Sequence, residues 1–106
     1  MIKMLDINQT KQGANVTICT ELTIYSVAQL KDELLVLLRA SPIVNVNLAQ
    51  VSDIDTSGLQ ILIMLKNEAK ALQHEVNFIE HSASVLRVFE LMNTVSFFGD
   101  PLVLTR

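Results

Sequence analysis

Alternating apolar and polar residues near the N-terminus predict two β-strands. Residues 15–20 have the period-two pattern of a half-buried strand, with Val16 and Ile18 at its apolar positions. Residues 2–8 form a second apolar segment, and a polar turn at residues 12–15 separates the two. We therefore expect a β-hairpin at the start of the chain.

A helical pattern follows the hairpin. Ser26 and Gln29 stand three residues apart, as in a capping box, directly before this pattern. Pro42 ends the helix, because the residue before a proline avoids the helical region. Apolar residues recur at three- and four-residue spacing and define a core stripe: Val27, Leu30, Leu34 and Leu37.

The next segment, residues 43–48, predicts a strand whose two faces differ. Val44, Val46 and Leu48 fall on one face, and Asn45 and Asn47 on the other. A strand covered by helices on both faces is apolar throughout. The asparagines therefore indicate that the helices gather on one face of the sheet.

The remaining pattern completes a single α/β domain over residues 1–106. After Ser57, apolar residues recur with the 3.6-residue period of a helix, and they predict a helix of roughly 12–15 residues. We then expect a strand at residues 76–79, a helix capped by Ser82 or Ser84 and a last strand at residues 102–104. The stripe of that last helix is Val85, Val88, Phe89 and Met92. This order predicts a mixed sheet of four to five strands with three or more helices, mainly on one face.

Residues 52–60, Ser-Asp-Ile-Asp-Thr-Ser-Gly-Leu-Gln, join a strand to the central helix. Asp55 or Thr56 is the expected N-cap, with an oxygen that accepts from the unpaired N–H groups of the first turn. Ser57 then lies in that turn, at the positive end of the helix dipole, where an anion such as a covalent phosphate is tolerated. Capping without any further function explains the same spacing.

Composition narrows the class of protein. Half of the chain is apolar, and its net charge of −3 gives no basic footprint, so nucleic acid is not an expected partner. The single cysteine, Cys19, fits a reducing compartment. The apolar runs are too short to span a bilayer, and no signal peptide is visible. We expect a cytoplasmic domain without a transmembrane segment.

No catalytic constellation stands out, so we expect no enzyme activity, cofactor or metal site. His74 and His81 lack further ligands at metal spacing, and surface positions are expected for both. A triad of Ser57, His81 and Asp55 would lack a nucleophile elbow. The run Asp-Thr-Ser-Gly superficially resembles that of retroviral-type aspartic proteases, but here it opens an apolar helix instead of lying in an all-β fold.

The segment Asp55-Thr56-Ser57-Gly58-Leu59, entered from an apolar strand, resembles the signature of the STAS domain family, the anti-sigma factor antagonists and their relatives. The resemblance extends to Glu21-Leu22 and to the spacing of Ala28, Leu30 and Leu34. One departure lies at residues 20–23, where Thr-Glu-Leu-Thr replaces the Gly-Glu-Leu-Asp of many members.

The resemblance implies a phosphorylatable interaction module. The family's serine or threonine before Gly-Leu is phosphorylated by a partner kinase, and Ser57 holds that position, with Asp55, Thr56 and Gly58 supporting it. The implied partners are an anti-sigma factor that is itself a serine kinase, and a serine phosphatase. We expect a monomer or weak dimer. The alternative is a structural STAS subunit of a lipid-transport ABC complex or a signalling scaffold, without a phospho-switch.

A partner-binding surface is expected beside Ser57. The loop residues Thr23 and Tyr25 are candidates from the first βα loop. At about 100° per residue, the core stripe of the helix after Ser57 contains Gly58, Ile61, Leu62, Leu65, Ala69 and Leu72. Leu59, Ile63 and Met64 fall outside that stripe, either as a partner-binding patch or as residues that neighbouring elements cover.

Overall fold

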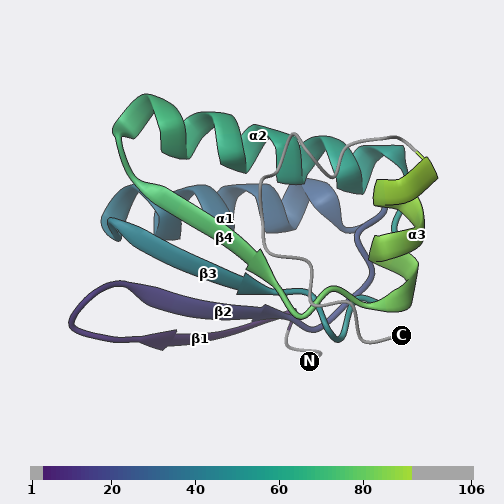
Figure 1. The fold of residues 1–106 in the computed structure, drawn as a ribbon, viewed down its shortest axis with the longest axis horizontal. Coiled ribbons are helices and arrows are strands. Elements are labelled where there is room, and N and C mark those ends of the chain that lie inside the picture. Colours follow the sequence, from purple (N-terminus) through teal and green to yellow (C-terminus); the bar gives the residue numbers. More distant parts are fainter. Residues whose placement is uncertain (1–3, 92–106) are drawn as a thin grey trace.

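The computed structural model describes residues 4–91. Figure 1 shows the elements in their order along the chain. They are β1 (Leu5–Gln9), β2 (Ala14–Ile18), α1 (Val27–Ala40), β3 (Ile43–Asn47), α2 (Thr56–Leu72), β4 (Glu75–Ile79) and α3 (Ala83–Leu91). The order predicted from the sequence is confirmed for these seven elements. The expected strand at 102–104 and the stripe residue Met92 lie outside the described residues.

The four described strands form one mixed sheet in the order β1-β2-β3-β4. β1 is antiparallel to β2, whereas β2, β3 and β4 are parallel. The hairpin turn lies a little earlier than expected, because Thr10 N–H donates to the Gly13 carbonyl at 2.8 Å. Because β2, β3 and β4 are parallel, their carboxyl ends lie together at one end of the sheet, on the right in Figure 1.

The two faces of the sheet differ as the asparagines predicted. Val44, Val46, Val76 and Phe78 face α1 and α2 and are buried. The opposite face carries one asparagine from each strand in a row, because Asn8 pairs with Asn15, Asn15 with Asn45 and Asn45 with Asn77. Asn45 donates to Asn15 at 3.0 Å, and Asn77 donates to Asn45 at 3.1 Å. The amide side chains thus form hydrogen bonds with one another on the face of the sheet that α1 and α2 do not cover.

The first helix begins after Ser26, but the expected capping box does not form. Ser26 Oγ instead donates to the Glu21 carbonyl at 2.7 Å and accepts from Thr23 N–H at 3.1 Å. Ser26 makes no capping bond to α1 because its hydroxyl folds the preceding loop. Of the two candidates for the third helix, Ser82 accepts from Val85 N–H at 3.3 Å and is the cap.

The core stripe of α2 is wider than the sequence predicted. Leu59 is only 3 % exposed, so the second of the two alternatives holds for it: neighbouring elements cover it, and it is not part of a surface patch. Ile63 and Met64 are half-buried and pack against the core, whereas the predicted stripe residue Leu72 is 38 % exposed. The reason is that α1 and β4 both pack against α2, so two flanks of the helix are covered and a single stripe is not enough.

Leu59→Ala should therefore destabilise the isolated domain. The loss of a buried leucine costs ~2–5 kcal/mol of unfolding free energy, and Leu62→Ala should fall in the same range. Urea unfolding followed by circular dichroism measures both, with exposed Gln60→Ala as a matched control close to wild type. A Leu59→Ala variant as stable as Gln60→Ala would contradict the burial of Leu59.

Candidate functional site

Two loops at the carboxyl edge of the sheet lie side by side and are bonded through their backbones. One spans residues 19–26 between β2 and α1, and the other spans residues 48–55 between β3 and α2. Leu22 N–H donates to the Asp53 carbonyl at 2.8 Å, and Asp55 N–H donates to the Leu22 carbonyl at 3.1 Å. This parallel bridge between Leu22 and Ile54 continues the sheet pairing into the loops.

The Asp55 side chain strengthens the junction of the two loops. Its Oδ1 accepts from Gly58 N–H at 3.0 Å, which makes Asp55, and not Thr56, the N-cap of α2. Its Oδ2 accepts from Ile24 N–H at 3.0 Å in the other loop. Partial desolvation raises the pKa of Asp55, but the N–H groups of Gly58 and Ile24 outweigh it, and the net pKa lies below the ordinary 3.8.

Gly58 is the point where α2 comes closest to the neighbouring loop. A Cβ at this position would collide with the carbonyl group and Cβ of Leu22. That same carbonyl accepts the Asp55 N–H, so it cannot move away without loss of the bridge. A residue without a side chain is therefore required here, for close approach rather than for backbone freedom.

The third helix holds the second loop from its other side. Ser82 Oγ donates to the Val51 carbonyl at 2.8 Å, and Ser84 Oγ donates to the Ser52 carbonyl at 3.0 Å. Residues 51–55 are thus bonded to the first loop on one side and to the start of α3 on the other. The start of α2 is a fixed position, which suits a recognition site better than a mobile loop does.

Ser57 lies in the first turn of α2 and is half-buried. Within residues 4–91 its hydroxyl makes no hydrogen bond. It lines a shallow depression of about 330 Å³ between α1 and α2, together with Lys31, Gln60 and Met64. Thr56 is exposed beside it. Both hydroxyls are thus accessible, and Ser57 alone has a hollow and a cation next to it.

The first loop is bonded to the start of α2 through Ile24 N–H and Asp55, and it exposes two large side chains. Tyr25 is 90 % exposed, as a partner contact requires, and Ile24 is 65 % exposed. Thr23 is instead buried, and its Oγ1 accepts from Tyr25 N–H at 3.3 Å. Ile24 is not among the partner-binding residues predicted from the sequence. Its place next to Tyr25 in a predicted loop could have indicated an exposed apolar position.

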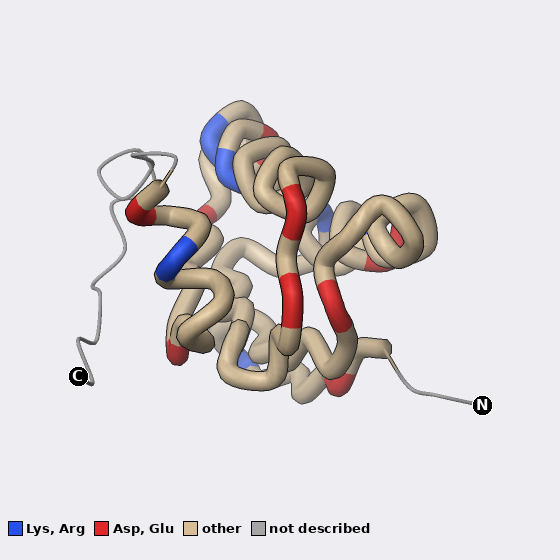
Figure 2. Tube along the Cα trace, turned by 90° about the vertical axis from the view of Figure 1, so that its right-hand side faces the viewer, with Lys and Arg blue, Asp and Glu red and all other residues tan. Residues whose placement is uncertain are grey.

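The same edge of the sheet is acidic. Residues 21–26 and 52–57 contain Glu21, Asp53 and Asp55 but no Lys or Arg. Figure 2 looks onto this edge, and acidic positions lie along the segments that lead into the helices. A phosphate added at Ser57 would therefore enter a region that is already negative.

The histidines take no part in this arrangement. His74 is half-buried, and its Nδ1 lies 2.9 Å from the Leu38 carbonyl. His81 is also half-buried and packs edge-on against Phe89, so the expected surface positions are wrong for both. The part of the chain that the structure describes contains no cluster of three His, Cys, Asp or Glu side chains that could hold a metal ion.

The family model described as "Mlab, STAS domain" matches residues 5–97. The chain belongs to this family of STAS domains. The match spans every described helix and strand, including both loops of the junction. No curated protein matches the chain in sequence. No helix in residues 4–91 of this STAS domain is long and apolar enough to cross a membrane.

Solved structures show the same fold. The anti-sigma factor antagonist SpoIIAA, unphosphorylated, is 17% identical with a TM-score of 0.73, over 93% of this chain and 89% of its own. Phosphorylated SpoIIAA from Bacillus is also 17% identical, with a TM-score of 0.69, over 93% and 92%. An anti-sigma factor antagonist from Mycobacterium paratuberculosis is 14% identical with a TM-score of 0.80, over 93% and 86%.

The fold also occurs within a much larger protein. SLC26A9 is 12% identical with a TM-score of 0.70, and the match covers 81% of this chain but 17% of SLC26A9. STAS domains therefore serve in different protein contexts, and the identities of 12–17% establish the fold alone. The function has to be argued from the site.

Asp55→Ala should lower the unfolding free energy by ~1–2 kcal/mol, as the loss of an N-cap does. The pH dependence gives a sharper test. Because the folded-state pKa of Asp55 is lowered, its contribution is present above about pH 4 and is lost as the pH falls through the folded-state value. Asp55→Asn should therefore flatten the fall in stability below about pH 4. Urea midpoints across that range measure it, and a wild-type pH profile in Asp55→Asn would contradict this role.

Gly58→Ala should destabilise the domain although alanine favours helices over glycine by about 1 kcal/mol. Its Cβ would push Leu22 away from the junction, at a cost typical of overpacking, ~1–3 kcal/mol. Gln60→Gly is the control, because it introduces glycine at an exposed position of the same helix. It should lower the unfolding free energy only by the lower helix propensity of glycine. Thermal unfolding compares the two variants, and a Gly58→Ala variant more stable than wild type would show that the loops are not held in contact.

Proposed function

We propose that this STAS domain is a protein-interaction module whose binding surface surrounds Ser57 and is switched off by phosphorylation of that residue. In its unphosphorylated form it would bind an anti-sigma factor of the serine-kinase type. A serine phosphatase would restore binding. The observation that carries the proposal is the Ser57 hydroxyl, which makes no hydrogen bond within residues 4–91. It is held in the first turn of α2, and the start of this helix is bonded to a loop that exposes Ile24 and Tyr25.

The surroundings of Ser57 would accept a phosphate without a change of fold. Phosphate adds about −1.5 to −2 charge. The helix N-terminus stabilises an anion by ~0.3–1 kcal/mol, and Lys31 lines the same depression. Asp53 and Asp55 act in the opposite sense by repulsion. These effects are small and opposed, so we expect little effect on the stability of the free domain.

A bound partner would respond much more strongly. Ile24 and Tyr25 are suited to anchor it, because a few exposed apolar and aromatic residues carry most of the binding energy in such interfaces. A phosphate on Ser57 would be buried at the interface, where Lys31 would offset its charge only in part, and an incompletely paired buried charge costs roughly 2–5 kcal/mol. At about 1.4 kcal/mol per decade this weakens binding by ~30-fold to a few thousandfold. The switch would thus act by direct repulsion at the interface.

The likeness to SpoIIAA supports this proposal, because that anti-sigma factor antagonist exists in a phosphorylated and an unphosphorylated form. A second function is favoured by the description of the matching family, "Mlab, STAS domain". In that case the same surface would hold a subunit of a lipid-transport ABC complex or a scaffold, and Ser57 would be a contact and not a switch.

Ser57→Asp and Ser57→Ala distinguish the two functions. For the switch, Ser57→Asp should weaken binding to the partner kinase about 30-fold or more, whereas Ser57→Ala should bind as wild type and accept no phosphate. Calorimetry measures the binding, and mass spectrometry of the chain incubated with the kinase and ATP locates the phosphate. A neighbouring gene for an anti-sigma factor of the serine-kinase type would identify the partner to use.

Asn67→Asp is the matched control, because it adds one negative charge to an exposed position of the same helix. Its binding should equal that of wild type. Phosphate on Ser57→Ala at the wild-type level would move the site to Thr56, to be tested with Thr56→Ala. Partner binding by Ser57→Asp at wild-type affinity would overturn the switch and leave the structural subunit.

A further inference from the structure

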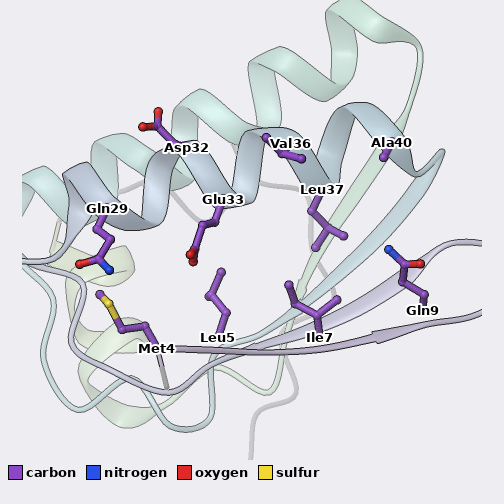
Figure 3. Close-up of a pocket in the computed structure, with 10 residues that line it drawn as sticks. All are labelled: Met4, Leu5, Ile7, Gln9, Gln29, Asp32, Glu33, Val36, Leu37 and Ala40. Carbon is purple, nitrogen blue, oxygen red and sulfur yellow. The ribbon is translucent and has the colours of Figure 1, made fainter. Parts of the chain in front are cut away.

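An apolar groove lies between the edge strand β1 and helix α1, on the flank of α1 away from α2. Its volume is about 690 Å³. Figure 3 shows Leu5 and Ile7 pointing from β1 toward α1, while Glu33 and Leu37 point from α1 toward β1. The apolar part of its lining consists of Met4, Leu5, Ile7, Val36, Leu37 and Ala40.

Two of these apolar residues are exposed well beyond what a domain surface requires. Val36 is 67 % exposed on the flank of α1, and Ile7 is 43 % exposed on the edge strand. Leu5 and Leu37 lie between them and are buried. An apolar surface that is continuous from a strand to a helix is typical of a docking site.

Neither described helix is centred over β1. α1 packs over β3, and α2 packs over β4. β1 is the edge strand and lies two strands from β3, so residues 4–91 leave the region above β1 beside α1 open.

Two carboxylates of α1 line the groove. Glu33 points toward β1, whereas Asp32 points away from β1 (Figure 3). None of the described residues that line the groove is Lys or Arg. Lys31 lines the depression beside Ser57, and Arg39 lies 3.4 Å from Glu68 of α2. Neither Asp32 nor Glu33 forms an ion pair within residues 4–91.

We propose that this groove binds an amphipathic helix of a partner protein, with an apolar face against Ile7 and Val36 and with Lys or Arg toward Asp32 and Glu33. An added β-strand would lie in the plane of the sheet beside β1 and would leave Val36 exposed, whereas a helix above β1 covers both residues. A second copy of this chain related by a two-fold axis would place the carboxylates of both copies in one interface. A basic helix avoids the repulsion between them. The surface is separate from the Ser57 site and does not depend on the function proposed for it.

A pair of designed peptides tests the proposal with the full chain. One is a 15-residue helical peptide, about 22 Å long, with leucines spaced three and four apart and lysines on either side of them. The other has glutamate in place of each lysine. The lysine peptide should bind about tenfold or more tightly than the glutamate peptide, measured by fluorescence anisotropy. Amide shifts in NMR spectra should fall on β1 and α1.

Variants of the groove sharpen the test. The double variant Asp32→Lys, Glu33→Lys should weaken binding of the lysine peptide about tenfold and favour the glutamate peptide instead. Val36→Thr and Ile7→Thr should each weaken both peptides severalfold, because they remove apolar contact area at similar shape. Glu75→Lys is the matched control, since it reverses an exposed carboxylate on the opposite edge strand. It should leave binding unchanged, as should Ser57→Asp.

Four results would overturn the proposal. They are the absence of binding by either peptide, equal affinity for the two, an affinity for the lysine peptide that survives the double charge reversal, and an extended backbone of the bound peptide in NMR. Light scattering provides a further check on the occupant. A dimer that forms at high concentration and is lost on Val36→Asp would assign the groove to a second copy of this chain.

Discussion

The parallel bridge between Leu22 and Ile54 is the interaction on which the candidate site depends. Backbone groups in loops must find partners when water is excluded, and here each loop supplies the partners of the other. The Asp55 carboxylate adds one bond to each loop, and the collision that a Cβ at Gly58 would make with Leu22 shows how closely they approach. The first turn of α2, which contains Ser57, is therefore held in a fixed position by the two loops.

Helix α1 divides the surface of the domain into two regions of different character. On its α2 side, Lys31 borders the depression that contains Ser57. On its β1 side, Asp32 and Glu33 border an apolar groove. Two separate surfaces on the flanks of one helix can serve two partners. This division fits an interaction module better than a catalytic domain, whose groups would converge on one pocket.

The fold by itself does not choose between the functions open to a STAS domain. Similar structures include separate anti-sigma factor antagonists and a part of SLC26A9, so the same sheet and helices serve different assemblies. This chain is distinguished by a few side chains near the start of α2. It keeps a serine directly before Gly58 and presents Ile24 and Tyr25 beside it, while Thr23 replaces the acidic residue of many members and is buried. Because the architecture is shared, differences in function have to come from side chains such as these.

The sequence by itself determined the element order, the one-sided burial of the sheet and the helix start at residues 55–57, because periodicity and capping chemistry are local. Tertiary packing decided the rest. Leu59 is buried because α1 and β4 cover two flanks of α2, and Ser26 leaves its helix uncapped because its hydroxyl folds the loop. Ile24, Gly58 and the groove over β1 gain their roles from contacts between segments about 30 residues apart. Such contacts leave no periodic signal, since they depend on how the layers stack and not on the order of residues along any one of them.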